Sequence, residues 1–339
     1  MKVIKNDCGQ VDSICNNSIS IKTFFYLIVL GIALAPVGVL AYECKKTDEC
    51  KKTLKLQSYE PNTIGWTWDK GDVDEGYLDF KISLKYPMFH KGNPKKANDY
   101  LPSPYFAFTG RLGQYIGSRN SSPVIGKRFN PKLFFRYWIG GDAEDKYFDI
   151  GYAHESNGQS VNSETMYQNL VNDFLAKGEE AYYADDYISR GWDYWDLVWK
   201  HKQNSMGGYV TTYINYKYFL DDGYLQGEPE EYNAWEGGTD GKKRKQVDGI
   251  TLIAKYSKGF DSDAQCGFLP ACKVALLYTT GAEDTFKYNT TRLEFTTKVF
   301  DIPIMLWASR GYNSDLVDYY QDVDSYGISI EMRTFIEDI

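Results

Sequence analysis

The sequence predicts an all-β protein, a transmembrane antiparallel up-and-down β-barrel of about 12 strands. Aromatic residues make up 16% of the 339 residues, with 29 Tyr and 8 Trp, and such an excess without repeated apolar runs is typical of membrane barrels with aromatic girdles. An apolar run at 24–41 follows the basic residues Lys2 and Lys5 and indicates export. Many segments alternate apolar and polar residues over about the 9–11 residues that a tilted membrane strand needs.

The chain divides into a leader, a short tail and one barrel domain. Residues 1–41 form a predicted signal peptide, because Val39 and Ala41 stand at the −3 and −1 positions of a cleavage site. A retained membrane anchor is the alternative, since the run is near spanning length. Residues 42–61 are polar and lack a strand period, which indicates a periplasmic tail. Residues 62–339 form the predicted barrel, with no linker that would divide them.

Cysteines and charge agree with an exported protein. Cys44 and Cys50 are six residues apart, as are Cys266 and Cys272, and such pairs in an exported chain indicate local disulfides. Zinc binding is the alternative, but only 3 histidines occur and none lies near either pair. The net charge of −8 argues against a nucleic-acid partner. The basic run 242–245 reads as a solvated loop tip.

Alternation assigns the strands of the first half. Residues 78–86 are the clearest case, because Leu78, Phe80 and Ile82 alternate with Asp79 and Lys81. Residues 165–175 are taken as a strand because they match the others in length. The expected strands of this half are 62–70, 78–86, 104–114, 132–140, 148–156 and 165–175.

The second half continues the pattern. In 192–201, Trp195, Leu197 and Trp199 share a face. The expected strands are 192–201, 209–220, 249–256, 273–280, 291–300, 302–309 and 323–333. Bacterial single-chain barrels have even strand numbers, so one of these segments is surplus. We expect one of the two segments beside Cys266–Cys272, 249–256 or 273–280, to lie in a loop.

Residues 148–158 carry the candidate chemistry. One strand face has Ile150, Tyr152, His154 and Ser156, and the other has Asp149, Gly151, Ala153 and Glu155. In a membrane barrel the apolar face meets lipid, so a nucleophile on it would meet acyl esters directly. A serine nucleophile needs a base and a third group that orients the base. A His-x-Ser pair alone is a weak signal, and the Gly-x-Ser-x-Gly elbow of soluble hydrolases is absent.

The surrounding residues resemble the outer-membrane phospholipase A family. That family carries His-x-Ser-Asn-Gly followed on the next strand by Trp-Asn, and this chain has His154-Glu155-Ser156-Asn157-Gly158 and then Tyr167-Gln168. Further similar stretches are Ser121-Ser122-Pro123 with Asn130-Pro131, Ser309-Arg310-Gly311-Tyr312 and Leu316-Val317-Asp318-Tyr319. The resemblance implies a calcium-dependent hydrolase of phospholipid acyl esters in a Gram-negative outer membrane, active as a homodimer with its site on the lipid-facing surface.

The resemblance also implies roles for single residues. Ser156 matches the nucleophile, His154 the general base, and Gln168 the orienting asparagine, with Asn169 as the alternative. The family's Ca²⁺ is held by a backbone carbonyl, a serine hydroxyl and a serine of the partner chain. These positions match Gln159, Glu164 and Ser121 of the partner subunit, where Ser122 could equally serve. A carboxylate at Glu164 is a better ligand for a hard cation than the hydroxyl it replaces.

Two other classes of protein stay open at this stage. Gln168 and Glu164 depart from the family pattern, so the chain could be an outer-membrane pore or adhesin that lacks catalysis. A soluble exported β-sandwich that binds glycans through its tryptophans is the third interpretation. An assay of calcium-dependent fatty-acid release separates the phospholipase from the pore or adhesin. Extraction behaviour separates the soluble β-sandwich from both, because a soluble protein needs no detergent.

Overall fold

The computed structural model describes residues 56–70, 74–88, 102–139, 145–227, 231, 235–236, 241–260 and 264–332. They form thirteen strands and three helical segments. The strands are β1 (Gln57–Ser58), β2 (Asn62–Lys70), β3 (Asp74–Pro87), β4 (Ser103–Gln114), β5 (Val124–Trp138), β6 (Lys146–Ser156), β7 (Gly191–Ser205), β8 (Gly208–Phe219), β9 (Gly249–Lys258), β10 (Cys272–Gly281), β11 (Asn289–Val299), β12 (Ile302–Gly311) and β13 (Val323–Met332). The helical segments are α4 (Glu164–Ala176), the 3₁₀ segment η1 (Ala181–Tyr187) and α5 (Arg244–Val247).

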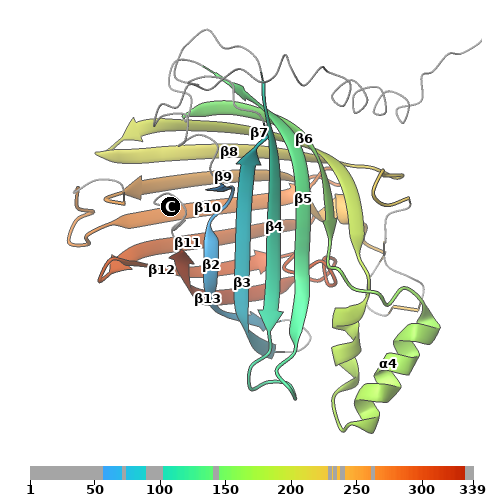
Figure 1. Ribbon diagram of the computed structural model, residues 1–339. Coiled ribbons are helices and arrows are strands. Elements are labelled where there is room, and N and C mark those ends of the chain that lie inside the picture. Colours follow the sequence, from blue (N-terminus) through green and yellow to red (C-terminus); the bar gives the residue numbers. More distant parts are fainter. Residues whose placement is uncertain are drawn as a thin grey trace, which may run out of the picture. The chain divides into compact units, whose positions relative to one another are not determined.

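Strands β2 to β13 close into one antiparallel barrel of twelve strands (Figure 1). Each strand pairs with its neighbours in sequence, and β13 pairs with β2 from Asp324↔Lys70 to Met332↔Asn62. Because the first and last barrel strands are hydrogen-bonded to each other, the wall has no free edge. The two-residue β1 pairs with β3. The predicted fold class and strand number are confirmed.

The wall has charged residues inside and apolar residues outside. Arg136 binds Asp149 at 2.7 Å in the interior, and Lys273 binds Glu331 at 2.7 Å. This is the inverse of a soluble protein and the pattern of a transmembrane barrel. The outer face exposes large apolar side chains in mid-strand: Phe106, Leu133, Ile150, Ile214, Leu276, Leu306 and Ile328. In the described part of the chain, no helix is both long and apolar enough to cross a membrane.

The two longest connections between strands lie at one end of the barrel. At the end where β6 stops and β7 begins, which we name the site end, the connections are long, among them 157–190, 220–248 and 312–322. At the far end β7 and β8 are joined by 206–207 and β11 and β12 by 300–301, whereas the connections 88–102 and 259–271 are longer. Outer-membrane barrels have short periplasmic turns and longer extracellular loops. Helix α4 protrudes at the site end (Figure 1).

The structure corrects two strand predictions. Residues 165–175 belong to helix α4, not to a strand, and both 249–256 and 273–280 are barrel strands, β9 and β10. The helix has a local cause that the length argument overlooked. Ser163 caps it by accepting the N–H of Met166 at 3.5 Å. Tyr167 and Phe174 lie on the half-buried side of the helix, and the ring of Phe174 packs on η1.

The loops of the site end fold over the barrel mouth around a small core of buried side chains. This core consists of Trp192, Val247, Leu316, Tyr319 and Tyr320. Beside it Arg244 is fully buried and donates to Glu155 at 2.7 Å and to Asp248 at 2.9 Å. The prediction of a solvated loop tip at 242–245 is therefore wrong for Arg244, because its charge is paired inside the mouth.

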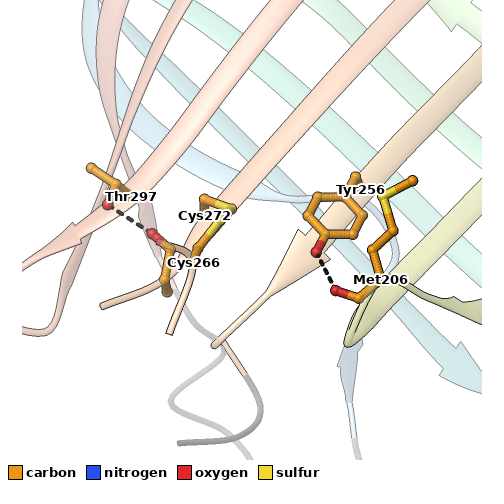
Figure 2. The surroundings of a disulfide bond; sticks show 6 residues. Met206, Tyr256, Cys266, Cys272 and Thr297 are labelled. Atoms are coloured by element: carbon orange, nitrogen blue, oxygen red, sulfur yellow. Dashed lines mark hydrogen bonds between the residues drawn. A yellow bond between two sulfur atoms is a disulfide. The ribbon is translucent and has the colours of Figure 1, made fainter. Parts of the chain in front are cut away.

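A disulfide closes the loop between β9 and β10 at the far end. Cys266 and Cys272 are joined, as their spacing predicts, and Figure 2 shows them beside Thr297, whose hydroxyl donates to the carbonyl of Ala271 at 2.8 Å. The predicted Cys44–Cys50 pair and the predicted signal peptide lie outside the described residues. Of the predicted tail, 56–61 is described, and its residues 57–58 form β1.

Candidate functional site

His154 and Ser156 lie on the outer face at the site end of β6. Burial alternates strictly along this strand, so that Ala153 and Glu155 are buried and His154 and Ser156 are half-buried. Glu155 points inward, where Arg244 and Lys217 compensate its charge at 2.7 and 3.3 Å. Because successive side chains of a strand point to opposite faces, these interior contacts turn Ser156 outward.

Asp193 lies directly opposite His154 on the neighbouring strand β7. The Nδ1 of His154 is 2.7 Å from the Oδ1 of Asp193, and the two side chains are 18% and 1% exposed. A carboxylate at Nδ1 fixes the imidazole so that Nε2 is free to accept a proton. The pair therefore has the geometry of a general base with its orienting group.

Ser156 stands two residues from His154 on the same face, so their Cα atoms are about 7 Å apart. Among the described residues, no hydrogen bond joins the hydroxyl of Ser156 to the imidazole. Such contacts are often loose without substrate and tighten in the reacting complex. The structure thus places Ser156 and His154 in one patch of the outer wall without a hydrogen bond between them.

The chain after Ser156 is held by Asn157, which is fully buried. Its side-chain amide donates to the carbonyl of Ile188 at 2.7 Å, and its Oδ1 accepts the N–H of Arg190 at 3.0 Å. Gly158 follows with φ +69°, where a Cβ would lie 3.0 Å from the ring of Phe129. Asn157 therefore clamps the end of β6 to the segment that leads into β7, while Gly158 lies against Phe129 of β5.

The second oxygen of Asp193 is bound from outside the barrel. Its Oδ2 accepts the backbone N–H of Leu225 at 2.8 Å and of Gln226 at 3.1 Å. The hydroxyl of Tyr152, on the outer face of β6, also hydrogen-bonds Asp193. Asp193 is therefore buried although it points outward, and both of its oxygens have donors.

Gln168 does not lie on the next strand. It is exposed on helix α4, as is Asn169, and the partner of the His154 ring is Asp193. The long connection 157–190 separates β6 from β7, so the aromatic-polar pair at the start of the next strand is Trp192-Asp193. One signal could have found it: Asp193 continues the outer face that Trp195 begins.

The three predicted calcium ligands are spread over the site end. Gln159 is half-buried just after the clamp, Glu164 is exposed at the first turn of α4, and Ser121 is exposed in the β4–β5 loop with φ +60°. Ser189 lies in the same connection as Gln159 and was not singled out from the sequence. Its N–H donates to the carbonyl of Val161 at 2.8 Å. The clamp and this bond place Ser189 across from 157–161.

Buried ion pairs anchor the long connection to the barrel. In η1, Asp186 binds Arg119 of the β4–β5 loop at 2.6 Å and Lys127 of β5 at 3.0 Å. Burial alone would raise the pKa of Asp186, but the two cations lower it below its ordinary value. Lys127 also binds Asp315 of the β12–β13 loop at 2.6 Å. The connection that delivers Ser189 and Trp192-Asp193 is thus fixed to two other loops.

No protein-family model and no curated protein sequence matches this chain. Among solved structures it is similar to outer membrane phospholipase A from Escherichia coli, with 14% identity and a TM-score of 0.55 over 83% of this chain and 99% of that chain. It is equally similar to the Salmonella typhi outer membrane phospholipase dimer with bound calcium, with 14% identity and a TM-score of 0.55 over 83% and 93%.

An asparagine-to-alanine active-site mutant of the Escherichia coli protein gives a TM-score of 0.54 at 14% identity, over 83% of this chain and 93% of that chain. At such identity the likeness concerns the fold alone. The chain therefore shares the fold of the outer membrane phospholipase A barrels.

Proposed function

We propose that this protein is an outer-membrane phospholipase that hydrolyses acyl ester bonds of glycerophospholipids with Ser156, His154 and Asp193. One observation carries the proposal. A histidine whose Nδ1 is 2.7 Å from a buried aspartate lies beside a serine on the outer wall of a membrane-type barrel. Nucleophile, base and orienting group are the three parts that acyl transfer by a serine requires. The resemblance at His154-Glu155-Ser156-Asn157-Gly158 supports the substrate class.

The reaction proceeds in two acyl transfers. The Oγ of Ser156 attacks the ester carbonyl carbon while the Nε2 of His154 takes its proton, and Asp193 stabilises the resulting imidazolium through Nδ1. The imidazolium then protonates the departing glycerol oxygen, which leaves an acyl-Ser156. A water molecule gives a proton to the Nε2 of His154 and attacks the acyl carbon; the Oγ of Ser156 then leaves with the proton that His154 returns to it, and a fatty acid is released. Base catalysis of this kind contributes roughly 10²–10⁴-fold.

The wall around the triad suits a lipid substrate. Ile150 is exposed on the same face of β6, four residues before His154. Leu133 is exposed on the neighbouring strand β5, where it pairs with Tyr152. Acyl chains that lie along such an apolar wall would bring their ester groups to its upper edge, where Ser156 stands. No aqueous cleft is needed for binding, because the bilayer itself presents the substrate.

The oxygen donors near the site suit Ca²⁺. Among the described residues no group of three or more His, Cys, Asp and Glu side chains could hold a metal ion. Carbonyl and hydroxyl oxygens are nevertheless ligands that Ca²⁺ accepts, and Gln159 and Ser189 offer these from one connection. The set is incomplete in one chain, so we propose that Ser121 of the partner subunit completes it in a homodimer, with Glu164 as a further carboxylate of the same connection.

When bound there, the ion would supply positive charge for the oxyanion of the tetrahedral intermediate. The chain's own contribution is to hold its donors. Asn157 and the backbone bond of Ser189 to Val161 keep the two arms of the connection together whether or not the ion is present.

The interior of the barrel favours catalysis over the alternative of an open pore. The interior contains paired charges, such as Lys132 with Asp196 and Arg136 with Asp149. The loop 312–322 packs its buried residues into the mouth. An open pore needs a free lumen, whereas an enzyme acting on the outer wall has no use for one.

The test is fatty-acid release by the purified protein from mixed micelles of phospholipid and detergent, with Ca²⁺ and then with a chelator. We expect release that depends on Ca²⁺ and that falls at least about 10³-fold in Ser156→Ala. Ser205→Ala, at the far end of β7, is the matched control and keeps full activity. Equal release by Ser156→Ala and the unaltered protein would overturn the proposal.

A further inference from the structure

The segment 221–227, which joins β8 towards β9, crosses the outside of the wall and covers Asp193. We name it the strap. It begins just after Leu220, whose N–H donates to the backbone carbonyl of Asp193 at 2.9 Å. Its turn is closed by the N–H of Gly223, which is 2.8 Å from the carbonyl of Gln226. The strap is thus a compact turn tied to the strand that it covers.

Three successive backbone N–H groups of the strap point at the wall, one at Tyr152 and two at Asp193. Tyr224 donates to the hydroxyl of Tyr152 at 2.9 Å, and Leu225 and Gln226 donate to the Oδ2 of Asp193 at 2.8 and 3.1 Å. Consecutive N–H groups that converge in a turn form a concavity for an anion. Here the anion is a carboxylate of the protein itself.

The strap presents its polar backbone inward and an apolar side chain outward. The side chain of Leu225 is 64% exposed, while its N–H is bound to Asp193. A charged side chain that faces hydrocarbon is costly unless it is paired and hydrogen-bonded. Asp193 is a charged side chain that points outward, and the strap gives it both hydrogen bonds and an apolar cover.

The fit between strap and carboxylate leaves no space for a methyl group. A Cβ on Gly223 would lie 2.0 Å from the Oδ2 of Asp193 and 2.4 Å from its Cβ. A Cβ on Gly227, four residues on in the same strap, would meet nothing within 4 Å. Neither glycine has a backbone conformation that an L residue avoids. Gly223 is therefore required by the contact with Asp193 and not by its own dihedral angles.

We propose that the strap is a positioning element: its N–H groups at Leu225 and Gln226 hold Asp193 as an ionised, lipid-shielded partner of His154, and Gly223 permits that approach. The inference rests on the proposed function for its effect on turnover. It rests on geometry alone for its effect on His154. An aspartate could not serve on a bare lipid-facing wall, so strap and aspartate belong together.

The strap also sets the proton affinity of the pair. Hydrogen bonds to a carboxylate stabilise its charge, so their loss makes the Asp193–His154 pair bind a proton more readily. Removal of the carboxylate has the opposite effect on His154. The titratable side chain that contacts Asp193 is Tyr152 of β6, on which the ring of Tyr224 packs. In the strap, the carboxylate of Asp221 lies 3.7 Å from Lys245, and Glu155 points to the other face of the wall.

The experiment compares Gly223→Ala with Gly227→Ala. We expect Gly223→Ala to lower kcat about 10-fold or more. We also expect the acid limb of the pH–rate profile to move upward by about one pH unit, because one pH unit corresponds to about the free energy of one hydrogen bond to a charged group. We expect Gly227→Ala to match the unaltered protein in both. In an Asp193→Ala background, Gly223→Ala should change the residual activity less than about 2-fold, because the partner of the clash is gone.

A second variant covers the case in which Gly223→Ala does not fold. Tyr152→Phe removes one donor to Asp193 without adding bulk and should move the acid limb in the same direction. Tyr218→Phe, an exposed tyrosine of the same outer wall, is its control. If the strap had only a structural role, these variants would reduce the amount of folded barrel but would not move the acid limb of the pH–rate profile.

The titration of His154 separates this inference from the proposed function. The chain has 3 histidines, so the ring signals can be assigned in labelled protein by His154→Gln and followed by NMR in micelles. In a Ser156→Ala background, Gly223→Ala should raise the midpoint of His154. An unchanged midpoint and an unchanged acid limb overturn the inference, even if Ser156→Ala proves the protein to be a phospholipase. If no hydrolysis occurs at all, the midpoint still decides it.

Discussion

Asp193 and His154 face each other across the β6–β7 pair with 2.7 Å between Oδ1 and Nδ1, although 39 residues separate them in the chain. Helix α4 and η1 fill most of that separation and protrude from the barrel end. The pairing register, and not proximity in sequence, therefore decides which residue orients the imidazole.

Replacement of Asp193 by asparagine should lower kcat about 10²–10⁴-fold. If the amide oxygen of this asparagine accepts the Nδ1–H of His154, its NH₂ group points towards the N–H groups of Leu225 and Gln226. The NH₂ group cannot accept their hydrogen bonds, so the two N–H groups lose their acceptor. The imidazole also loses its negative neighbour, so the acid limb of the pH–rate profile should move to lower pH. Steady-state fatty-acid release across pH measures both effects.

The control for this variant is Asp173→Asn, an exposed carboxylate of helix α4, which should leave rate and profile unchanged. A fully active Asp193→Asn protein with an unshifted limb would show that His154 does not depend on the carboxylate.

Replacement of Gln168 by alanine should leave hydrolysis within about 2-fold of the unaltered protein. The side chain is exposed on helix α4, and the ring that it was expected to orient is bound to Asp193. Exposed substitutions away from special features change stability by about 0.5 kcal/mol or less, so folding should not confuse the result. If Gln168→Ala is as inactive as Ser156→Ala, the orienting role returns to Gln168.

Strand periodicity carried most of the fold prediction, because a wall with charges inside and apolar groups outside imposes period 2 on every strand. The error at 165–175 arose because an eleven-residue segment fits a strand or a short helix equally well in length. The Ser163 cap and the i, i+3, i+4, i+7 spacing of Tyr167, Leu170, Val171 and Phe174 were the local signals of a helix.

The site was only half predictable for a different reason. His154 and Ser156 are neighbours on one strand, so alternation alone joins them. Asp193 reaches them through the register of β7, and the strap reaches Asp193 through the path of a loop. The alternation of β7 places Asp193 on the outer face with Trp195, but the register of β7 against β6 and the path of the loop leave no periodic trace in the sequence.

Replacement of Arg244 by methionine should lower the free energy of unfolding by about 3 kcal/mol, because it leaves buried Glu155 and Asp248 with less compensating charge. Arg244 donates to these two carboxylates at 2.7 and 2.9 Å. Urea unfolding of the barrel in lipid vesicles measures the loss. Lys245→Met removes the neighbouring cation, which pairs at the surface with Glu283 at 2.9 Å, and should cost about 1 kcal/mol or less. Equal losses in the two variants would contradict the buried network.

Replacement of Cys266 and Cys272 by alanine should destabilise the barrel by about 2 kcal/mol, as expected for a short closed loop. Because the disulfide joins the β9–β10 loop to the first residue of β10 at the far end, kcat should stay unchanged under conditions where the barrel is folded. The thermal midpoint and the rate of hydrolysis are the two measurements. Reduction of the unaltered protein should reproduce the shift, and a loss of activity without a loss of stability would contradict the prediction.

Asp318 should make the stability of the mouth depend on pH. Burial, with the charges of Asp315 and Asp186, raises its pKa to about 8, whereas an unfolded aspartate titrates near about 4. Between these values the folded state binds more protons than the unfolded state, so stability falls as pH rises. Asp318→Asn should remove this fall, which urea midpoints at pH 4.5, 6 and 8 would detect. Asp322 is exposed in the same loop, so the urea midpoints of Asp322→Asn should change with pH as those of the unaltered protein do. If the midpoints of Asp318→Asn also change in that way, Asp318 does not hold a proton in the folded state.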